Sequence, residues 1–270
     1  MYWFLVGILI IVGVIVTYKY KRTRLYESLK TRKFNPMWIN ILNDNLSLYT
    51  KLTDDQKYKL HGLINIFLHE KEFSGYNGLV ITDEIRVTIA AQACLLLLNR
   101  DGDLYPSLKN IFVYPDAFKS MQPSYDGTIK IMRESIRVGE SWHLGHVVLS
   151  WFHSKKGGRN DHDGQNVVYH EFAHQLDHQD GAIDGTPILD TTDSYKNWSV
   201  VFSTEFDRLR KKVNKHQKTL IDSYGSLSEG EFFAVATELF FEKPKLFERE
   251  HPKLYNELRN YYHLNPSDWF

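Results

Sequence analysis

The stretch VVYHEFAHQLDHQDG, residues 167–181, gathers three histidines, one glutamate and two aspartates. His170, Glu171 and His174 fit the pattern H-E-x-x-H, in which residues four apart lie on one face of a helix. Both imidazoles can therefore reach one ion, and zinc accepts neutral imidazole nitrogens at about 2.0–2.1 Å. Glu171 lies one step around the helix, where a carboxylate can reach a water at the ion and serve as a general base. A charged surface helix is the plainer alternative, which the apolar residues of the same stretch disfavour.

A zinc site of this kind needs a third protein ligand, and two aspartates lie close to the motif. Asp180 follows His170 by ten residues, the spacing of H-E-x-x-H-x-x-G-x-x-H enzymes. Those enzymes place a glycine where this chain has Asp177, and they carry a methionine turn downstream, where this chain has no methionine. Asp177 itself is a short carboxylate on the same straight helix, so it better suits the helix end or an outer-shell partner.

A third candidate, Glu231, opens a later apolar helix, from which a glutamate would complete a His₂Glu site. Ser228 and Glu231 also fit the capping-box pattern S-x-x-E, in which Glu231 would only satisfy the helix start. Glu238, one heptad later on the same face, is a rival ligand or a carboxylate that orients a histidine. The residues alone leave the third ligand open among these acids.

The elements that must position these residues are expected to be mostly helices around a small sheet, an α+β fold. Apolar residues recur at helical spacing over four segments, of which the first two begin at capping threonines: 53–73, 82–100, about 194–217 and 226–244. Strand-like patterns mark three more: 110–115, 129–140 and 145–152. The run GHVVLSW, from residue 145, fits either an exposed sheet edge that holds a substrate as an added strand or a plain core strand.

Composition narrows the class of protein. The 33 basic and 33 acidic residues balance, but seven of the basic ones lie within residues 18–33 beside a single glutamate. With 43% hydrophobic residues the chain can bury a sizeable core. No nucleic-acid-binding motif or phosphate-binding glycine loop is visible, so no nucleic-acid partner is expected. The single cysteine, Cys94, excludes an internal disulfide and gives no sign of an oxidising compartment.

The N-terminal segment is uncharged and almost entirely apolar over residues 2–17, close to the lower limit of about 17 residues for a spanning helix. We expect a transmembrane anchor over 1–18 and a basic juxtamembrane segment over 19–33. No basic residue precedes the run and no small-residue cleavage site follows it, which disfavours a signal peptide. Because positive charge follows the run, the expected location is the membrane, single-pass, with the remaining domain, 34–270, in the cytoplasm.

Five segments together resemble a known family: TDEIRVTIAAQACLLLL, VYPDAF, GESWHLGHVVLSW, GQNVVYHEFAHQLDHQDG and YGSLSEGEFFAVATELFFEKP. From about residue 55 to 268 the chain resembles the zinc-dependent peptidase family of the Mlc titration factor A, the glucose-regulated metallopeptidases. The resemblance implies a zincin-like zinc metallopeptidase domain over 34–270 with Zn²⁺ as cofactor. It also implies His170, His174 and Glu231 as ligands and Glu171 as the catalytic glutamate.

The family's catalytic domain is similar to that of anthrax lethal factor, in which a tyrosine stands seven residues before the helix that begins with the ligand glutamate. In this chain that tyrosine is Tyr224. The resemblance implies that its phenol stabilises the oxyanion of a tetrahedral intermediate. An ordinary loop aromatic is the alternative at this position.

We therefore expect a membrane-anchored zinc peptidase that hydrolyses a peptide or protein substrate, with Glu171 as general base. The alternative is a regulatory protein that binds a transcriptional repressor or another partner, with a structural or weakly active zinc site. The resemblance supports both, and a zinc hydrolase of a non-peptide amide is a third hypothesis. The apolar N-terminal segment departs from the soluble family members, which bears on the partner more than on the chemistry.

Overall fold

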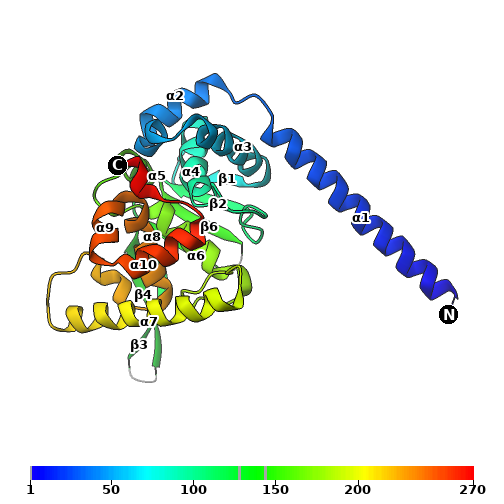
Figure 1. Ribbon diagram of the computed structural model, residues 1–270. Coiled ribbons are helices and arrows are strands. Elements are labelled where there is room, and N and C mark those ends of the chain that lie inside the picture. Colours follow the sequence, from blue (N-terminus) through cyan, green and yellow to red (C-terminus); the bar gives the residue numbers. More distant parts are fainter. Residues whose placement is uncertain (1, 127–128, 143–144) are drawn as a thin grey trace.

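The computed structural model describes residues 2–126, 129–142 and 145–270, and the side chains of residues 4, 11–118, 138–140 and 145–270. Most of the chain is helical, and a long N-terminal helix projects away from the other elements (Figure 1). The α-helices are α1 (Tyr2–Lys30), α2 (Pro36–Asn45), α3 (Asp54–Glu70), α4 (Asp83–Leu95), α5 (Trp151–Arg159), α6 (Val167–Asp177), α7 (Thr192–Asn214), α8 (Glu229–Glu242), α9 (Pro244–Glu250) and α10 (Pro252–Tyr262).

A small mixed sheet lies beside α6 and has the order β1-β2-β6-β5. Its strands are β1 (Glu72–Gly75), β2 (Asn110–Tyr114), β5 (Gly139–Trp142) and β6 (His146–Ser150). The first three strands in this order are parallel, and β5 runs antiparallel to β6 with Gly139 opposite Leu149. The run GHVVLSW thus forms an internal strand paired on both sides, so the core-strand alternative is correct. The strand at the edge of the sheet next to α6 is β5.

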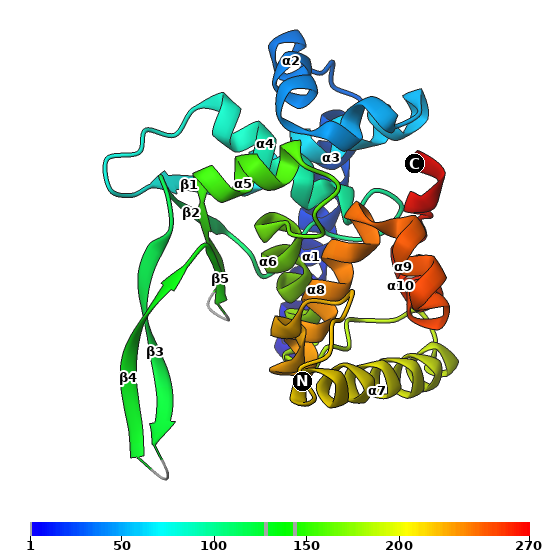
Figure 2. The ribbon, with the colours of Figure 1, turned by 90° about the vertical axis from the view of Figure 1, so that its left-hand side faces the viewer.

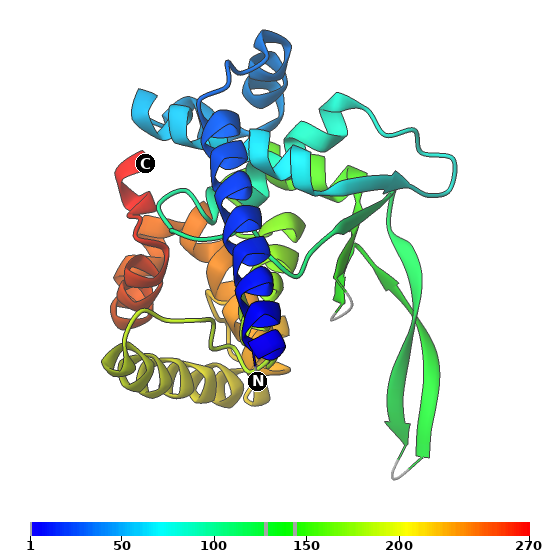
Figure 3. The same cartoon turned by 90° about the vertical axis from the view of Figure 1, so that its right-hand side faces the viewer.

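A separate antiparallel hairpin joins β3 (Phe118–Asp126) to β4 (Ile129–Arg137). Figures 2 and 3, which view the molecule from opposite sides, both show the hairpin extending beyond the sheet. Its pairing runs from Phe118 opposite Arg137 to Asp126 opposite Ile129. The expected strand over 129–140 therefore divides into β4 and the start of β5.

The hydrophobic core is built around α8, whose residues from Phe232 to Glu242 are all buried. Tyr169 of α6 packs against Phe241 of α8 with ring centroids 5.2 Å apart. On another side of α8, Phe232 packs against Phe206 of α7 with centroids 5.7 Å apart. Aromatic packing of this kind fixes the distance between α6, which carries His170 and His174, and α8, which carries Glu231.

The expected membrane anchor is wrong. Among the residues that the structure describes, no helix is both long enough and apolar enough to cross a membrane. The uncharged run of residues 2–17 gives about 24 Å of helix at 1.5 Å per residue, short of the roughly 30 Å hydrocarbon core. Helix α1 then continues without interruption through the basic residues to Lys30. Met1 and the side chains of residues 2, 3 and 5–10 lie outside the described part of the chain.

The fold class and the location change with this correction. The mostly helical structure with a small mixed sheet agrees with the expected α+β fold. The expected transmembrane helix before it does not agree with the structure, because no described helix can span a membrane. The single-pass membrane location, the membrane contact and the cytoplasmic placement rested on that helix and are withdrawn. The division at residues 18 and 19 falls inside α1. A metallopeptidase domain over 34–270 stays a prediction.

Candidate metal centre

The start of α6 places both motif histidines. Asn166 caps the helix, because its side-chain oxygen accepts hydrogen bonds from the backbone nitrogens of Val168 and Tyr169 at 3.0 and 3.1 Å. The backbone N–H of Asn166 donates in turn to Glu238 Oε2 of α8 at 2.5 Å. One capping residue thus fixes where α6 begins and ties that end to α8. Asn166 was missed from the sequence, although an asparagine directly before an apolar run is an ordinary capping signal.

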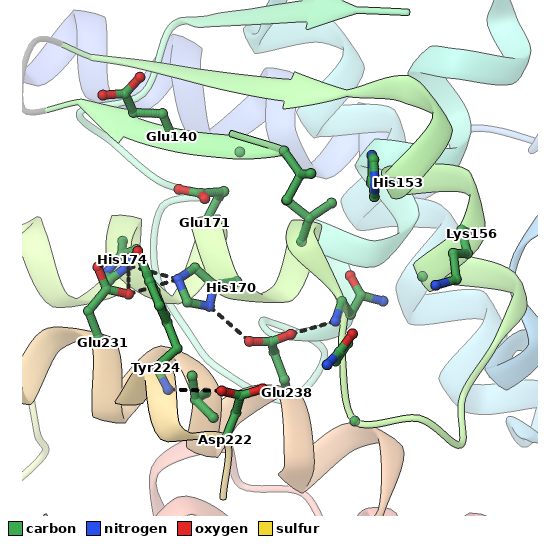
Figure 4. A pocket seen from close by; sticks show the side chains of 18 of the residues that line it. Glu140, His153, Lys156, His170, Glu171, His174, Asp222, Tyr224, Glu231 and Glu238 are labelled. Atoms are coloured by element: carbon green, nitrogen blue, oxygen red, sulfur yellow. Dashed lines mark hydrogen bonds and ion pairs between the residues drawn. The ribbon is translucent and has the colours of Figure 1, made fainter. Parts of the chain in front are cut away.

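The start of α8 positions Glu231. The hydroxyl of Ser228 accepts a hydrogen bond from the backbone N–H of Glu231 at 3.2 Å, which is the first half of a capping box. The Glu231 carboxylate points toward α6 instead of back to the helix start. Its Oε2 lies 3.0 Å from His170 Nε2 and 3.3 Å from His174 Nε2. Figure 4 shows the three side chains converging from the two helices.

Three nitrogen and oxygen atoms meet at this point. The third separation, between the Nε2 atoms of His170 and His174, is 3.2 Å. His170, His174 and Glu231 are the one group of at least three potential ligands that lie within 4.8 Å of one another in the described part of the chain. Two histidines from one helix and a glutamate from another therefore form a compact donor set.

The donor set fits a tetrahedral ion. Ligands at about 2.0–2.1 Å from a tetrahedral ion lie about 3.3–3.4 Å from one another, close to the three separations found here. Glu238 Oε1 accepts a hydrogen bond from His170 Nδ1–H at 2.8 Å, so Nε2 is the nitrogen that can bind an ion in place of the proton it shares with Glu231. Two imidazole nitrogens 3.2 Å apart can share one hydrogen at most, whereas one cation can accept an electron pair from each of the three ligand atoms.

The electrostatics of the site favour positive charge at its centre. Burial lowers the pKa of the His170 imidazole, but hydrogen bonds to Glu231 and Glu238 outweigh burial and raise that pKa well above its usual range. Burial raises the pKa of the Glu231 carboxyl, yet hydrogen bonds from His170 and His174 bring it below its ordinary value. A carboxylate held ionised beside two imidazoles is a charge arrangement that favours the binding of a metal cation.

Glu171 lies against the edge strand on the other side of the pocket. Its side chain is only 6% exposed and lines a cavity of about 650 Å³ together with His170, His174 and Glu231. Val138 and the first two residues of β5, Gly139 and Glu140, line the same cavity. Figure 4 shows the Glu171 carboxylate between the strand that carries Glu140 and the motif histidines. Its carboxylate is not one of the three clustered ligand atoms, and it faces the same cavity as they do.

Tyr224 reaches the donor set from a short 3₁₀ turn, Ser223–Ser226. Its hydroxyl lies 3.5 Å from Glu231 Oε1, and its ring centroid lies 5.9 Å from that of His170. The carboxylate of Asp222 accepts a hydrogen bond from the backbone N–H of Tyr224 at 2.8 Å and so fixes the turn. The phenol therefore points into the pocket beside the donors.

The two aspartates after the motif lie apart from the donor set. Asp177 is fully buried, and its Oδ2 accepts a hydrogen bond from the backbone N–H of Gly185 at 3.0 Å. Asp180 accepts a hydrogen bond from the backbone N–H of Ala182 at 3.0 Å in the following turn. Neither residue lines the cavity. Both aspartates therefore accept hydrogen bonds from the backbone of the segment that follows α6.

Comparison with known proteins gives one family. Residues 18–263 match the model of the family described as glucose-regulated metallo-peptidase M90. The "Uncharacterized protein slr2042" of Synechocystis sp. is 43% identical over 242 residues, which cover 89% of this chain and 88% of that protein. The Mlc titration factor A of Pectobacterium atrosepticum is 27% identical over 82% of this chain and 84% of its own length. The Mlc titration factor A of Escherichia fergusonii is 25% identical over 237 residues, which cover 86% of this chain and 87% of that protein. The similarity to anthrax lethal factor stays an expectation.

Proposed function

Because the chain belongs to the glucose-regulated metallo-peptidase M90 family, we propose that it is a zinc-dependent peptidase with His170, His174 and Glu231 as ligands. The observation that carries the proposal is the meeting of two Nε2 atoms and one carboxylate oxygen within 3.0–3.3 Å of one another. Two histidines and a glutamate leave one position of a tetrahedral ion for water or substrate, as in known zinc peptidases.

The proposed mechanism divides three tasks among the side chains around the donors. Zinc, when bound, lowers the pKa of a water toward neutrality and polarises the substrate carbonyl. The Glu171 carboxylate takes the proton of the attacking water and passes it to the leaving amine. The Tyr224 hydroxyl donates a hydrogen bond to the oxygen on which negative charge develops. Glu238 holds the His170 ring in one orientation and one tautomer through Nδ1.

The substrate class follows from the edge of the sheet. In the described structure β5 is the last strand of the sheet order, and its first residues line the cavity opposite the donors. An extended peptide can add to such an edge through main-chain hydrogen bonds, which tolerate many side chains. We propose that an extended peptide segment is the substrate, with its scissile bond between β5 and the donor set.

Replacing Glu238 with glutamine is expected to weaken zinc binding by about 10–100-fold, the range typical of a lost outer-shell partner. The amide keeps the shape of the side chain but cannot accept as strongly from His170 Nδ1–H. Competition with a chromogenic chelator measures the change. An affinity equal to that of the unchanged chain would show that Glu238 does not orient His170.

A second function has one specific observation in its favour. Several relatives carry the name Mlc titration factor A, which points to the binding of a regulatory protein. Under this alternative the chain binds a partner such as a repressor, and the metal site is structural or weakly active. The peptidase is the better-supported proposal because a general base and a phenol face the same cavity as the donors.

A mixed peptide library incubated with the zinc-loaded full chain tests the proposed function. Mass spectrometry of the products identifies the cleaved bonds and separates removal of terminal residues from internal cleavage. Cleavage that depends on Glu171 would support a peptidase. A zinc-loaded chain that cleaves no member of the library would favour the regulatory alternative.

A further inference from the structure

Gly139, the first residue of β5, lies unusually close to Glu171. A Cβ atom built on Gly139 would lie 2.5 Å from Glu171 Oε1 and 2.7 Å from Glu171 Cγ. It would also lie 2.6 Å from Cγ2 of Val167, one turn earlier on α6. Contacts this short are far inside van der Waals separation, so any side chain at position 139 forces a displacement. The Glu171 carboxylate thus occupies the space that the missing side chain leaves.

The backbone on both sides of this contact is fixed. Strand β5 is held to β6 by the pairing of Gly139 with Leu149 and by the hydrogen bond from the Ser150 N–H to the Val138 carbonyl at 2.8 Å. Helix α6 is tied at its start to Glu238 and anchored in the core by Phe172, which is fully buried. The end of the Glu171 side chain can turn about its own single bonds, so it can be displaced while the backbone of β5 and of α6 stays in place.

We propose that Gly139 is a positioning residue for Glu171: its missing side chain lets the edge strand approach α6 and hold the carboxylate at its place in the cavity. The inference rests on the proposed function, in which Glu171 is the general base. None of the three donor residues is among the nearest neighbours of the added Cβ. A side chain at position 139 therefore displaces the base and leaves the metal ligands in place.

The first test replaces Gly139 with alanine in the full chain. Turnover is expected to fall about 100-fold, the effect that a displacement of about 1 Å can have on a reacting group. Zinc affinity is expected to stay unchanged, and KM is expected to change much less than kcat. The matched control is Gly13→Ala, because nothing lies within 4 Å of a Cβ at Gly13. Unchanged turnover in Gly139→Ala would overturn the inference.

A double-mutant cycle separates positioning of Glu171 from a general effect on the fold. If Gly139→Ala acts through Glu171, adding it to Glu171→Gln causes no further loss of activity. A second loss of about 100-fold on top of Glu171→Gln would contradict the inference. Near-normal turnover in the Glu171→Gln chain would instead contradict the proposed function, so the two failures are distinguishable.

A further variant guards against poor folding of Gly139→Ala. Val167→Ala removes the Cγ2 atom that the new Cβ would meet and leaves Glu171 as the remaining close contact. The Val167→Ala chain is expected to keep its turnover, and the Gly139→Ala/Val167→Ala chain is expected to fold and to be about 100-fold slower. Equal turnover in these two chains would overturn the inference.

Discussion

The Glu171→Gln chain is expected to bind zinc as tightly as the unchanged chain and to lose peptide hydrolysis. The amide keeps the size of the side chain, which matters because Glu171 is only 6% exposed and lies against Gly139. It cannot accept the proton of the attacking water, and general-base catalysis typically contributes about 10²–10⁴-fold. The expected loss is at least of that order, measured as kcat on a fluorogenic peptide at equal zinc content.

The control for this experiment is Glu140→Gln, which removes a carboxylate from the neighbouring strand at the same cavity. That change is expected to leave turnover within a few-fold of the unchanged chain, because the proposed substrate contact is made by the main chain of β5 and no step of the mechanism uses the Glu140 side chain. Near-normal turnover in Glu171→Gln would rule out Glu171 as the base.

The second large effect is expected at Glu231. Glu231→Ala removes the carboxylate oxygen that lies 3.0 Å from His170 Nε2 and 3.3 Å from His174 Nε2. Zinc affinity should fall by far more than the 10–100-fold typical of an outer-shell partner, and activity should disappear. A pure capping role predicts a different result, a loss of about 1 kcal/mol of stability with metal binding intact. The cap itself survives in the variant, because Ser228 accepts from the backbone N–H of residue 231.

The matched controls are Asp177→Ala and Asp180→Ala, which remove the two carboxylates nearest to the motif in the sequence. Both chains are expected to retain zinc, because neither aspartate lines the cavity. Asp177→Ala should also destabilise the fold, since Gly185 N–H loses its acceptor. Tight zinc in Glu231→Ala, together with lost zinc in either aspartate variant, would overturn the ligand assignment.

The local signals in the sequence predicted several elements closely. Thr53 and Thr82 cap α3 and α4 as expected, with a complete capping box at Thr53. The expected strand 110–115 corresponds to β2, and the helix expected to stop at Pro244 is α8. The helices combine a capping residue with helical spacing of their apolar residues, and β2 alternates buried with partly buried residues, so neighbouring residues alone specify these elements.

Other features could not be predicted from local signals. Strand β5 has only four residues, too few to show a period, and β1 is equally short. The S-x-x-E pattern at Ser228 is the same whether the glutamate caps its helix or turns toward another helix, and only the packing of α8 on α6 distinguishes the two. Gly139 carries no signal in a single sequence, because the need for a missing side chain arises from a helix that follows it in the chain.

The N-terminal segment carries a local signal that points to the wrong structure. The apolar run of residues 2–17 is long enough to suggest a membrane anchor but shorter than the roughly 20 residues that usually span a bilayer. In the structure α1 continues to Lys30, and Arg22 forms ion pairs with Glu70 and Asp103. The basic part of the helix therefore contacts the rest of the chain.

The most direct test of a zinc peptidase is metal removal and return on one preparation of the full chain. Zinc is measured in the purified protein, removed with a chelator and added back in known amounts, and hydrolysis of a peptide library is followed at each step. We expect one zinc per chain, hydrolysis that ends when zinc is removed, and recovery in proportion to the zinc returned. Hydrolysis that persists without zinc, or a fully zinc-loaded chain that cleaves no peptide, would contradict this expectation.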